Sequence, residues 1–408
     1  MRVAHEPSVA GEHLDRLGSA RPYDPVAHDM AGAADRQPRV LHVIHSLRRG
    51  GLERVLIAVA NGLTKRGIPQ AICCQHELGA LRDAVDSEVD LFVLRAGPND
   101  PRTPFRLRRI IRDWRPDVLH SEDFSVWAEC VAALRCKGSP FHMHTFHGFL
   151  ETPPRRWRGL GRILAGMTHD LYAVSHVVAE QVAETFTIPV SRVNLLQNGV
   201  DCYRFRPNSV EPAAIPRPGQ SSAHPRVICV SVASLKPVKN PGLLVEAAAR
   251  THANAHFVWV GDGPLRDEVE DLAKRLGVAD RFTLAGAVDD VRPWLAAADL
   301  FVLSSDREAA PVGVLEAMSM GLAIVATRTG DLADRVELSG AGLLTATQDP
   351  KELAAAIDCL GRDPALRRRM GDSGRRHIEK HASHTGMLDR YLEAYEQCRT
   401  GACSALAG

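Results

Sequence analysis

The sequence predicts an α/β protein with two doubly wound parallel sheets. Three observations favour this fold class. Short apolar runs alternate with amphipathic helical stretches from Arg39 onward, a proline-rich polar stretch interrupts them at 206–225, and the alternation then resumes. Such alternation is typical of parallel sheets covered by helices on both faces. Because ligands bind at the carboxyl ends of such strands, we expect the two domains to face a central cleft that holds the site.

The 408 residues are too many for one core and suit two domains with additions. Residues 1–37 mix charge, Pro, Gly and His without a period and predict a disordered tail. The other predicted parts are an N-terminal Rossmann-like domain at 38–205, a linker at 206–225, a C-terminal Rossmann-like domain at 226–380, and a C-terminal helix at 381–408 that packs back toward the N-terminal domain.

Composition argues against several classes of protein. Lysine plus arginine number 50 and aspartate plus glutamate 49, and aromatic residues make up 5%, so neither charge nor stacking favours nucleic acid. Nine scattered cysteines, an odd number, argue against a disulfide framework and for a reducing cytoplasm. We expect no membrane-spanning helix, because no apolar run approaches about 18 residues, and no signal peptide at the N-terminus.

The elements of the first domain follow in order. A strand at 39–47 leads through a loop and an amphipathic helix at 48–67 to a second strand at 69–75. Four further short apolar runs predict strands at 91–96, 117–122, 140–147 and 170–175.

The second domain repeats this alternation. Five apolar runs predict strands at 226–235, 256–263, 282–288, 299–305 and 322–327. Apolar residues at helical spacing predict helices at 240–252, 264–278 and 314–320, a helical tail from Pro350, and a last helix at 384–399.

The most informative motif is SSDREAAPVGVLEAMSMG at 304–321. It predicts a strand end, a loop carrying Glu308, and a helix carrying Glu316, with Pro311 in the first turn. Free amides and the helix dipole favour an anion there, and carboxylates can hold hydroxyl groups. The pattern indicates a phosphorylated sugar, although an ordinary helix with surface glutamates remains an alternative.

Tandem glycines, Gly50 and Gly51, separate the first strand from its helix and allow a ligand to approach the backbone. The alternative is a plain tight turn. The loop lacks the G-x-G-x-x-G pattern of dinucleotide enzymes, which disfavours a nicotinamide cofactor.

Three histidines, His142, His144 and His147, lie in the run HMHTFHG. Without a carboxylate at ligand spacing we expect no metal site. Alternation places His142 and His144 on one face as structural histidines, whereas His147 at the strand exit is the one that can touch a substrate.

Two lysines, Lys236 and Lys239, follow a strand and precede a helix. A lysine there can direct its charge at a phosphate, although a solvated surface pair is the alternative. The turn VGDGP at 260–264 and the run FTLAGAVDD at 282–290 are weak signals alone; the second could offer backbone groups to a nucleobase.

Together these motifs resemble glycosyltransferase family 4, the retaining GT-B type, from about residue 39 to residue 390. The matching motifs are GGLER at 50–54, HG at 147–148, AVS at 173–175, QNGVDCYRFRP at 197–207, VASLKPVKN at 232–240, GDGP at 261–264, AGAV at 285–288 and EAAPVGVLEAM at 308–318.

The resemblance implies a nucleotide-sugar donor held by the C-terminal domain and an acceptor held by the N-terminal one. It implies catalytic roles for Lys239 at the diphosphate, Glu308 near the sugar hydroxyls and His147 at the sugar from the N-terminal side. The implied substrate-binding residues are Gly50, Gly51, Lys236, Asp262, Val288 at the base, Glu316 at the ribose, and the backbone amides of Ala310, Val312 and Gly313. It implies no cofactor and no metal.

Four positions depart from the family pattern. Ser234 stands where an arginine is usual, so that Lys239 has less help with the diphosphate unless Lys236 compensates. Ala309 replaces a frequent glycine, Pro311 removes one amide donor, and residues 330–334 lack the common double glycine and glutamate. These changes put the donor's identity in question more than the reaction.

The implied activity is that of a hexosyltransferase of class EC 2.4, in the cytoplasm, acting on a lipid-linked or growing glycan of the cell surface. Basic stretches with tryptophan at 106–115 and 153–164 suit an anionic membrane face, and solvated helix faces are the alternative. A GT-B-shaped phosphorylase, a nucleotide-sugar epimerase, a dinucleotide oxidoreductase and a silent nucleotide-sugar-binding protein also remain open.

Overall fold

The computed structural model describes residues 36–97, 100–134, 139–150, 155–215, 227–346 and 348–400. The predicted tail therefore lies almost wholly outside the described residues, as does the linker from residue 216 on. Two compact units are present: one takes in the chain up to Thr145, Gly159–Leu171 and the chain from Leu392 on, and the other holds Phe146–Arg158 and Tyr172–Tyr391. The predicted domain boundaries remain a prediction.

The first sheet has seven strands in the order β3-β2-β1-β4-β5-β6-β7. The printed pairings of β1 with β2 and β4, of β2 with β3, and of β4 with β5 are parallel. Its strands are β1 (Val40–Ser46), β2 (Gln70–Glu77), β3 (Asp90–Val93), β4 (Val118–Ser121), β5 (Phe141–Phe146), β6 (Asp170–Ala173) and β7 (Val193–Leu195).

The second sheet has six strands in the order β10-β9-β8-β11-β12-β13, and all its pairings are parallel. Its strands are β8 (Val227–Val232), β9 (Ala255–Val260), β10 (Phe282–Gly286), β11 (Leu300–Leu303), β12 (Ala323–Thr327) and β13 (Gly342–Thr345). The predicted α/β class with two parallel sheets is confirmed.

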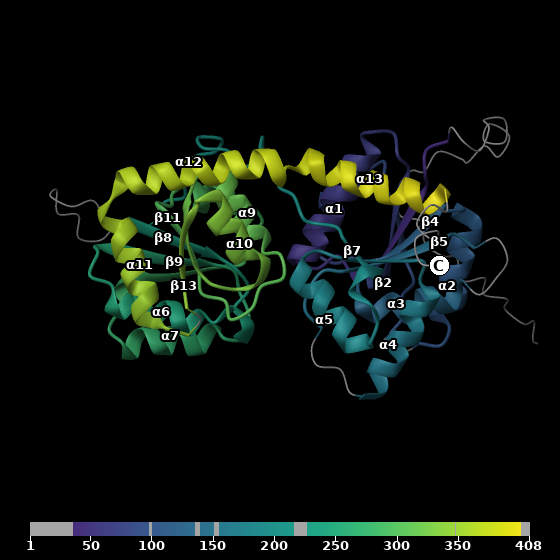
Figure 1. Ribbon diagram of the computed structural model, residues 1–408, viewed down its shortest axis with the longest axis horizontal. Helices are drawn as coiled ribbons and strands as arrows, with labels where there is room; N and C mark the ends of the chain where they lie inside the picture. The colour runs from purple at the N-terminus through teal and green to yellow at the C-terminus, as the bar shows by residue number, and fades with distance from the viewer. Residues whose placement is uncertain are drawn as a thin grey trace, which may run out of the picture. The chain divides into compact units, whose positions relative to one another are not determined.

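Helices cover these sheets (Figure 1). The early helices are α1 (Gly51–Thr64), α2 (Thr103–Trp114), α3 (Phe124–Ala133), α4 (Arg155–Met167) and α5 (His176–Phe186). The later helices are α6 (Pro241–Arg250), α7 (Arg266–Arg275), α8 (Arg292–Ala296), α9 (Val312–Ser319), α10 (Gly330–Ser339), α11 (Pro350–Arg362), α12 (Pro364–His381) and α13 (His384–Thr400). Short 3-10 turns lie at Arg82–Ala84, Val190–Arg192, Pro237–Lys239 and Ala279–Arg281.

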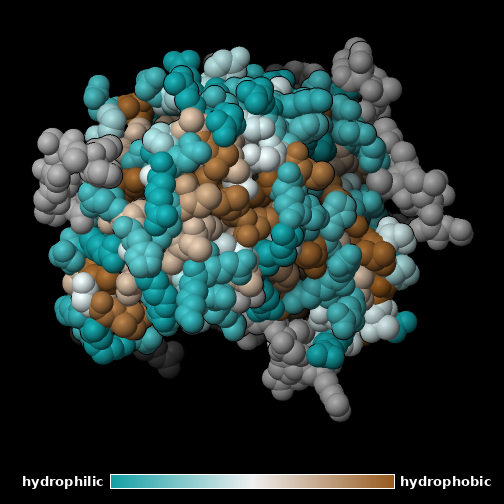
Figure 2. Space-filling view, turned by 60° about the vertical axis from the view of Figure 1, so that its left-hand side comes forward, coloured by the Kyte–Doolittle hydropathy of each residue, from teal (hydrophilic) through white to brown (hydrophobic). Residues whose placement is uncertain are grey.

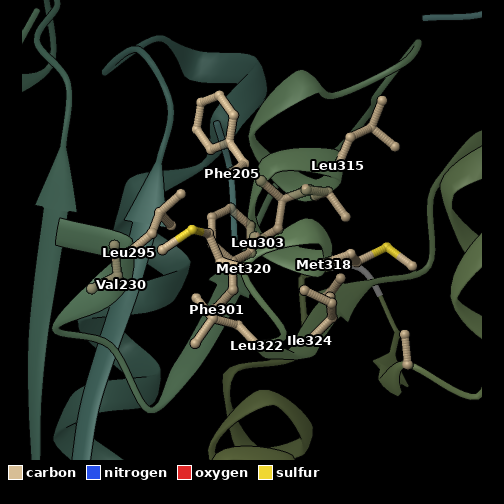
Figure 3. Close-up of a cluster of buried hydrophobic side chains, with 14 of the residues drawn as sticks. Phe205, Val230, Leu295, Phe301, Leu303, Leu315, Met318, Met320, Leu322 and Ile324 are labelled. Atoms are coloured by element: carbon tan, nitrogen blue, oxygen red, sulfur yellow. The ribbon is translucent and has the colours of Figure 1, made fainter. Parts of the chain in front are cut away.

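Each face of the second sheet packs against its own group of helices. Along β11, Phe301 and Leu303 join a core with residues of α9, α10 and α12, whereas Leu300 and Val302 join another with residues of α6, α7 and α11. Successive side chains of a strand point to opposite faces, so a strand buried on both faces reads as an unbroken apolar run. Figure 3 shows the first of these cores, which lies beneath α9.

Sequence periodicity missed β7 and β13, each of which is one of the two edge strands of its sheet. It also missed α8 and α10. The described part of the predicted linker packs on the second unit, where Ile215 is buried and the Ala213 amide donates to the Pro293 carbonyl at 2.8 Å.

Hydrophilic side chains cover most of the face seen in Figure 2, with hydrophobic residues in separate groups among them. No helix in the described part of the chain combines the length and the apolar character needed to cross a bilayer.

Candidate active site

The loops that follow β8 and β11 lie together because these two strands are parallel neighbours. The Ser304 hydroxyl donates to the carbonyls of Lys239 and Asn240, at 3.1 and 2.9 Å. The Asn240 side chain donates to Asp306 at 2.9 Å, and the Asp306 amide donates to the Val238 carbonyl. These bonds fix the position of the loop that carries Lys239.

Lys239 and Glu308 form a close ion pair. The Lys239 Nζ lies 2.8 Å from Oε1 and 2.7 Å from Oε2 of Glu308. The Glu308 side chain is 4% exposed and the Lys239 side chain is 24% exposed. The carboxylate is therefore buried, and the lysine is the partner that solvent can reach. The Ser305 hydroxyl adds a hydrogen bond of 2.6 Å to Oε1. Two residues predicted to be catalytic therefore meet directly.

Helix α9 begins beside this pair. Pro311 is its N-cap rather than a first-turn residue, and no side chain caps the first amides. Gly313 lies against the end of β8, because a Cβ there would stand 2.9 Å from the Val232 carbonyl oxygen. Asn198 donates to the Ala310 carbonyl at 3.3 Å and holds the preceding loop. Uncapped amides and the positive end of the helix dipole favour an anion at this place.

The second glutamate of the motif, Glu316, is buried within α9 and is 8% exposed. Leu315 and Met318 of the same helix belong to the core drawn in Figure 3, together with Phe301 and Leu303 of β11. This packing fixes α9 against the sheet that carries the Lys239 loop.

The predicted turn at 261–264 supports the Lys239 loop from the side of β9. The Leu235 amide donates to the Asp262 carbonyl at 3.0 Å, and Gly261 and Gly263 lie so close to that loop that a Cβ would strike its backbone. The Asp262 side chain is exposed and lies 3.8 Å from Arg266. Lys236 is exposed beside Ser234, and Val288 packs partly against the core beyond β10.

His147 lies just after β5 and is half-buried in the second unit. Two residues later, Phe149 lies under the Arg307 guanidinium, 5.2 Å from the ring centre. The loop that carries His147 therefore contacts the residue next to Glu308. Gly50 and Gly51 belong to the first unit, where Gly50 is the N-cap of α1 and a Cβ on Gly51 would meet open space.

Comparison with known proteins gives the family. Residues 49–204 match the family described as Glycosyltransferase Family 4, and residues 224–363 match Glycosyl transferases group 1. A D-inositol 3-phosphate glycosyltransferase 2 of Catenulispora acidiphila is 31% identical over 83% of this chain and 87% of its own length. The chain belongs to glycosyltransferase family 4. It is an enzyme of the hexosyl-transferring class EC 2.4, as its sequence predicted.

Other similarities agree with this family. A lipopolysaccharide core biosynthesis glycosyltransferase, LpsE, of Rhizobium meliloti is 26% identical over 87% of this chain and 98% of its own length. A glycosyltransferase from Rickettsia africae has a similar structure, with a TM-score of 0.76, 19% identity, and coverage of 89% and 98%. Anabaena HepE, solved in complex with UDP and glucose, gives a TM-score of 0.71 at 18% identity, with coverage of 88% and 99%. These structures confirm the GT-B fold.

Several residues that hold the site of this glycosyltransferase were not predicted. Ser304, Ser305 and Asp306 are small polar residues in the loop that follows β11, Asn240 is the N-cap of α6, and Asn198 lies in the quoted QNGVD motif. A buried polar residue at a strand end needs a partner, and this requirement was the signal available.

Asp331, one of the departures from the family pattern, caps another helix of the glycosyltransferase. Its carboxylate accepts from the amides of His176 and Val177, at 2.7 and 3.1 Å, and lies 3.1 Å from the His176 Nδ1. The N-cap of α5, Ser175, makes no side-chain cap. A residue 155 positions away therefore stabilises the start of α5.

A buried polar network lies in the first unit and was also not predicted. His42 and His120 both approach Oε1 of Glu122, at 2.6 and 3.0 Å, and the Tyr395 hydroxyl lies 2.9 Å from His120. The His42 and His120 nitrogens and Glu122 lie within 4.8 Å of one another, a grouping that could hold a metal ion. The separations match hydrogen bonds, and each histidine also bonds through Nε2, to Gln70 and Thr145.

The other two histidines, His142 and His144, are fully buried and share the Ser121 hydroxyl, at 3.0 and 2.8 Å. Burial lowers the pKa of His142 to about 3, with smaller contributions from His169 and His120. His144 stacks on Trp127 with ring centres 4.5 Å apart. Both side chains lie in the buried interior of the first unit. Their structural role stays a prediction.

Proposed function

We propose that this glycosyltransferase moves a sugar, with retention of anomeric configuration, from a nucleoside diphosphate sugar to a glycan or lipid-linked acceptor. One observation carries the proposal: the Lys239 ammonium is fixed at Glu308, which lies four residues before the uncapped first residue of α9, Val312. A cation and helix amides at one strand edge suit a diphosphate leaving group, and a carboxylate suits sugar hydroxyls.

The reaction would proceed without a metal-bound leaving group. As the bond from C1 to the phosphate oxygen breaks, Lys239 and the amides of Val312 and Gly313 would stabilise the charge that grows on the phosphate. The acceptor oxygen would bond to C1 on the same face, and its proton would pass to the departing phosphate oxygen. Glu308 would orient the sugar, and His147 would contact it from the loop after β5.

The remaining binding roles follow the family pattern. We place the ribose at Glu316, the base at the backbone of Val288, and the loop at Gly50 and Gly51 near phosphate or acceptor. Lys236 would take over part of the charge of the arginine that is absent at Ser234, and Asp262 would support the Lys239 loop through its carbonyl.

The class of donor and acceptor is inferred from relatives. HepE binds UDP and glucose in its crystal structure, which supports a uridine donor. LpsE acts in lipopolysaccharide core biosynthesis, and an Escherichia coli relative, 25% identical over 70% of this chain, is a galactosyltransferase acting on a diphosphoundecaprenol-linked sugar. We propose a role in cell-surface polysaccharide synthesis in the cytoplasm.

Helix α2 supports a peripheral position on the inner face of the cell membrane. It exposes 71% of Phe105, and Arg108, Arg109 and Arg112 line the same hollow as this ring. Aromatic and basic side chains on one helix suit an anionic lipid surface. Co-sedimentation with phosphatidylglycerol vesicles at low salt tests this proposal, and absence of binding would assign a soluble position.

A panel of nucleoside diphosphates tests the proposed function. The cognate diphosphate should raise the unfolding temperature in a concentration-dependent way, because a ligand that binds the folded state stabilises it. Incubation with the matching nucleotide sugar and a lipid-linked acceptor should then give a product whose anomeric configuration, read by NMR, equals that of the donor. Absence of stabilisation by every diphosphate would contradict the proposal.

The same assay separates the alternatives. A phosphorylase would release sugar only with added phosphate, and an epimerase would convert a nucleotide sugar without acceptor. A silent binding protein would be stabilised by the donor and leave it intact. No specific contact in the described residues favours one of these over transfer.

A further inference from the structure

The Glu308 carboxylate already accepts three hydrogen bonds without a ligand. Lys239 directs two contacts at it, one to each oxygen, and Ser305 donates a third to Oε1. An ammonium group has three N–H donors, so the ion pair occupies most of the capacity of Lys239. Any diphosphate that uses Lys239 must therefore share it with a neighbouring negative charge.

The negative charge of Glu308 beside Lys239 affects the binding of a nucleoside diphosphate and of its sugar conjugate in opposite ways. A sugar-free nucleoside diphosphate brings negative charge toward Glu308 and offers the carboxylate no hydrogen-bond donor. Because Glu308 is 4% exposed, solvent screens this repulsion poorly. A sugar-bearing donor presents hydroxyl groups, which can donate to the carboxylate and offset the repulsion.

We infer that Glu308 is a specificity-determining residue that selects the sugar-bearing donor over the sugar-free nucleoside diphosphate. This inference rests on the proposed function and adds a role in rejecting the reaction's own product. Repulsion from Glu308 weakens the hold of Lys239 on the diphosphate once the sugar has left. The product then dissociates more readily than the charge of Lys239 alone would allow.

The substitution Glu308→Gln tests the charge with little change in shape. The amide oxygen can still accept from Ser305 and Lys239, while the negative charge is gone. Glu337→Gln is a matched control, because this exposed carboxylate of α10 pairs with Arg328 and has no place in the site. Lys239→Met and the double variant Lys239→Met with Glu308→Gln complete a double-mutant cycle.

Isothermal titration calorimetry of the full chain with UDP, GDP and ADP, each beside its glucose conjugate, gives the readout. We expect Glu308→Gln to bind the cognate diphosphate on the order of 10-fold more tightly than the native chain. Its affinity for the sugar conjugate should not rise, so that the ratio of the two affinities shifts toward the product. The gain in diphosphate affinity should shrink when Lys239 is absent, because Glu308 then has no cation to withhold from the diphosphate.

The outcomes separate this inference from the proposed function. If the native chain binds a diphosphate and Glu308→Gln binds it equally or less tightly, the inference fails and the proposed function stands. The inference also fails if both ligands gain equally. If no nucleotide binds the native chain or any variant, the proposed function fails and the inference fails with it.

Discussion

In the proposed reaction, Lys239 is the side chain that stabilises the negative charge on the departing phosphate. Removal of a comparable preorganised donor costs about 2.7–4 kcal/mol of transition-state stabilisation in other enzymes. We therefore expect Lys239→Ala to lower kcat by about 100-fold or more, measured as product formed per minute at saturating donor.

The matched control is Lys274→Ala, which removes an exposed lysine that pairs with Asp271, one turn earlier on α7. Its kcat should stay within about twofold of the native value. A fall of less than about threefold for Lys239→Ala would remove this lysine from the mechanism.

His142 links the stability of the first unit to pH. Its folded pKa is about 3, whereas an unperturbed histidine has a pKa of 6.5. Between these values the unfolded chain binds a proton that the folded chain does not, so this contribution is present above pH 6.5 and is lost as pH falls. The loss approaches about 1.4 kcal/mol per pH unit well below pH 6.5.

His142→Gln removes this titration while an amide still faces Ser121. In urea unfolding followed by tryptophan fluorescence, the stability of the variant should depend less steeply on pH between 6.5 and 5 than that of the native chain. His252→Gln, at an exposed histidine, should leave the pH dependence unchanged. Parallel pH profiles for the native chain and His142→Gln would contradict the assignment.

At the scale of the helix, replacing glycine with alanine should have opposite effects on stability in α9 and in α4. In α9, Gly313→Ala would bring a methyl group to 2.9 Å from the Val232 carbonyl, so α9 must shift. In α4, a Cβ on Gly159 meets nothing within 4 Å, so alanine brings only its better helix propensity.

We expect Gly313→Ala to lower the free energy of unfolding by about 1–3 kcal/mol and to weaken diphosphate binding. Gly159→Ala should raise that free energy by about 0.5–1 kcal/mol without affecting binding. Differential scanning calorimetry and calorimetric titration measure both effects. Equal changes in the two variants would mean that α9 does not depend on its close approach to β8.

At the scale of the whole molecule, the end of α13 completes the core of the first unit. Tyr395 and Cys398 are buried there, and they bond to His120 and Asp170. A chain that stops after Tyr391 should leave these partners unsatisfied and open a large cavity. We expect a loss of about 3–5 kcal/mol in the stability of that unit.

Hydrogen exchange measures this loss strand by strand. Amides of β1 and β4 should exchange faster in the shortened chain, while those of β8 and β9 keep their protection. A chain that stops after Thr400 is the control and should behave as the full chain does. Unchanged protection of β4 in the chain that stops after Tyr391 would show that the first unit does not need α13.

The sequence predicted the parallel sheets because their strands are buried on both faces and appear as apolar runs, such as residues 300–303. It also predicted Lys239 and Glu308 as site residues. Their direct ion pair was not predictable, since 69 residues separate them and only the order of strands brings them together. Strand β7 has three residues, too few to show a period, and β13 begins with Gly342, a residue type that weakens a strand pattern.

Polar networks whose residues come from different strands could not be predicted from the sequence either. His42, His120 and Glu122 lie in apolar runs, where a polar residue needs a buried partner, but no local pattern says which residues meet. The cap that Asp331 provides for α5 was not predictable for the same reason, because Asp331 lies far from α5 in the sequence. The spacing of residues within one helix or strand can be recognised in a sequence, whereas contacts between residues of different elements depend on the three-dimensional fold.

The path of the chain has a consequence for exchange of parts between relatives. The chain passes between the two units at Thr145, Arg158, Leu171 and Tyr391, so that neither unit is one continuous stretch of sequence. A hybrid made by a single crossover near residue 210 would combine strands β1–β7 of one parent with helix α13 of the other. Hybrids should work best when residues 392–400 come from the parent that supplies residues 36–145 and 159–171, because Tyr395 and Cys398 then meet their own His120 and Asp170.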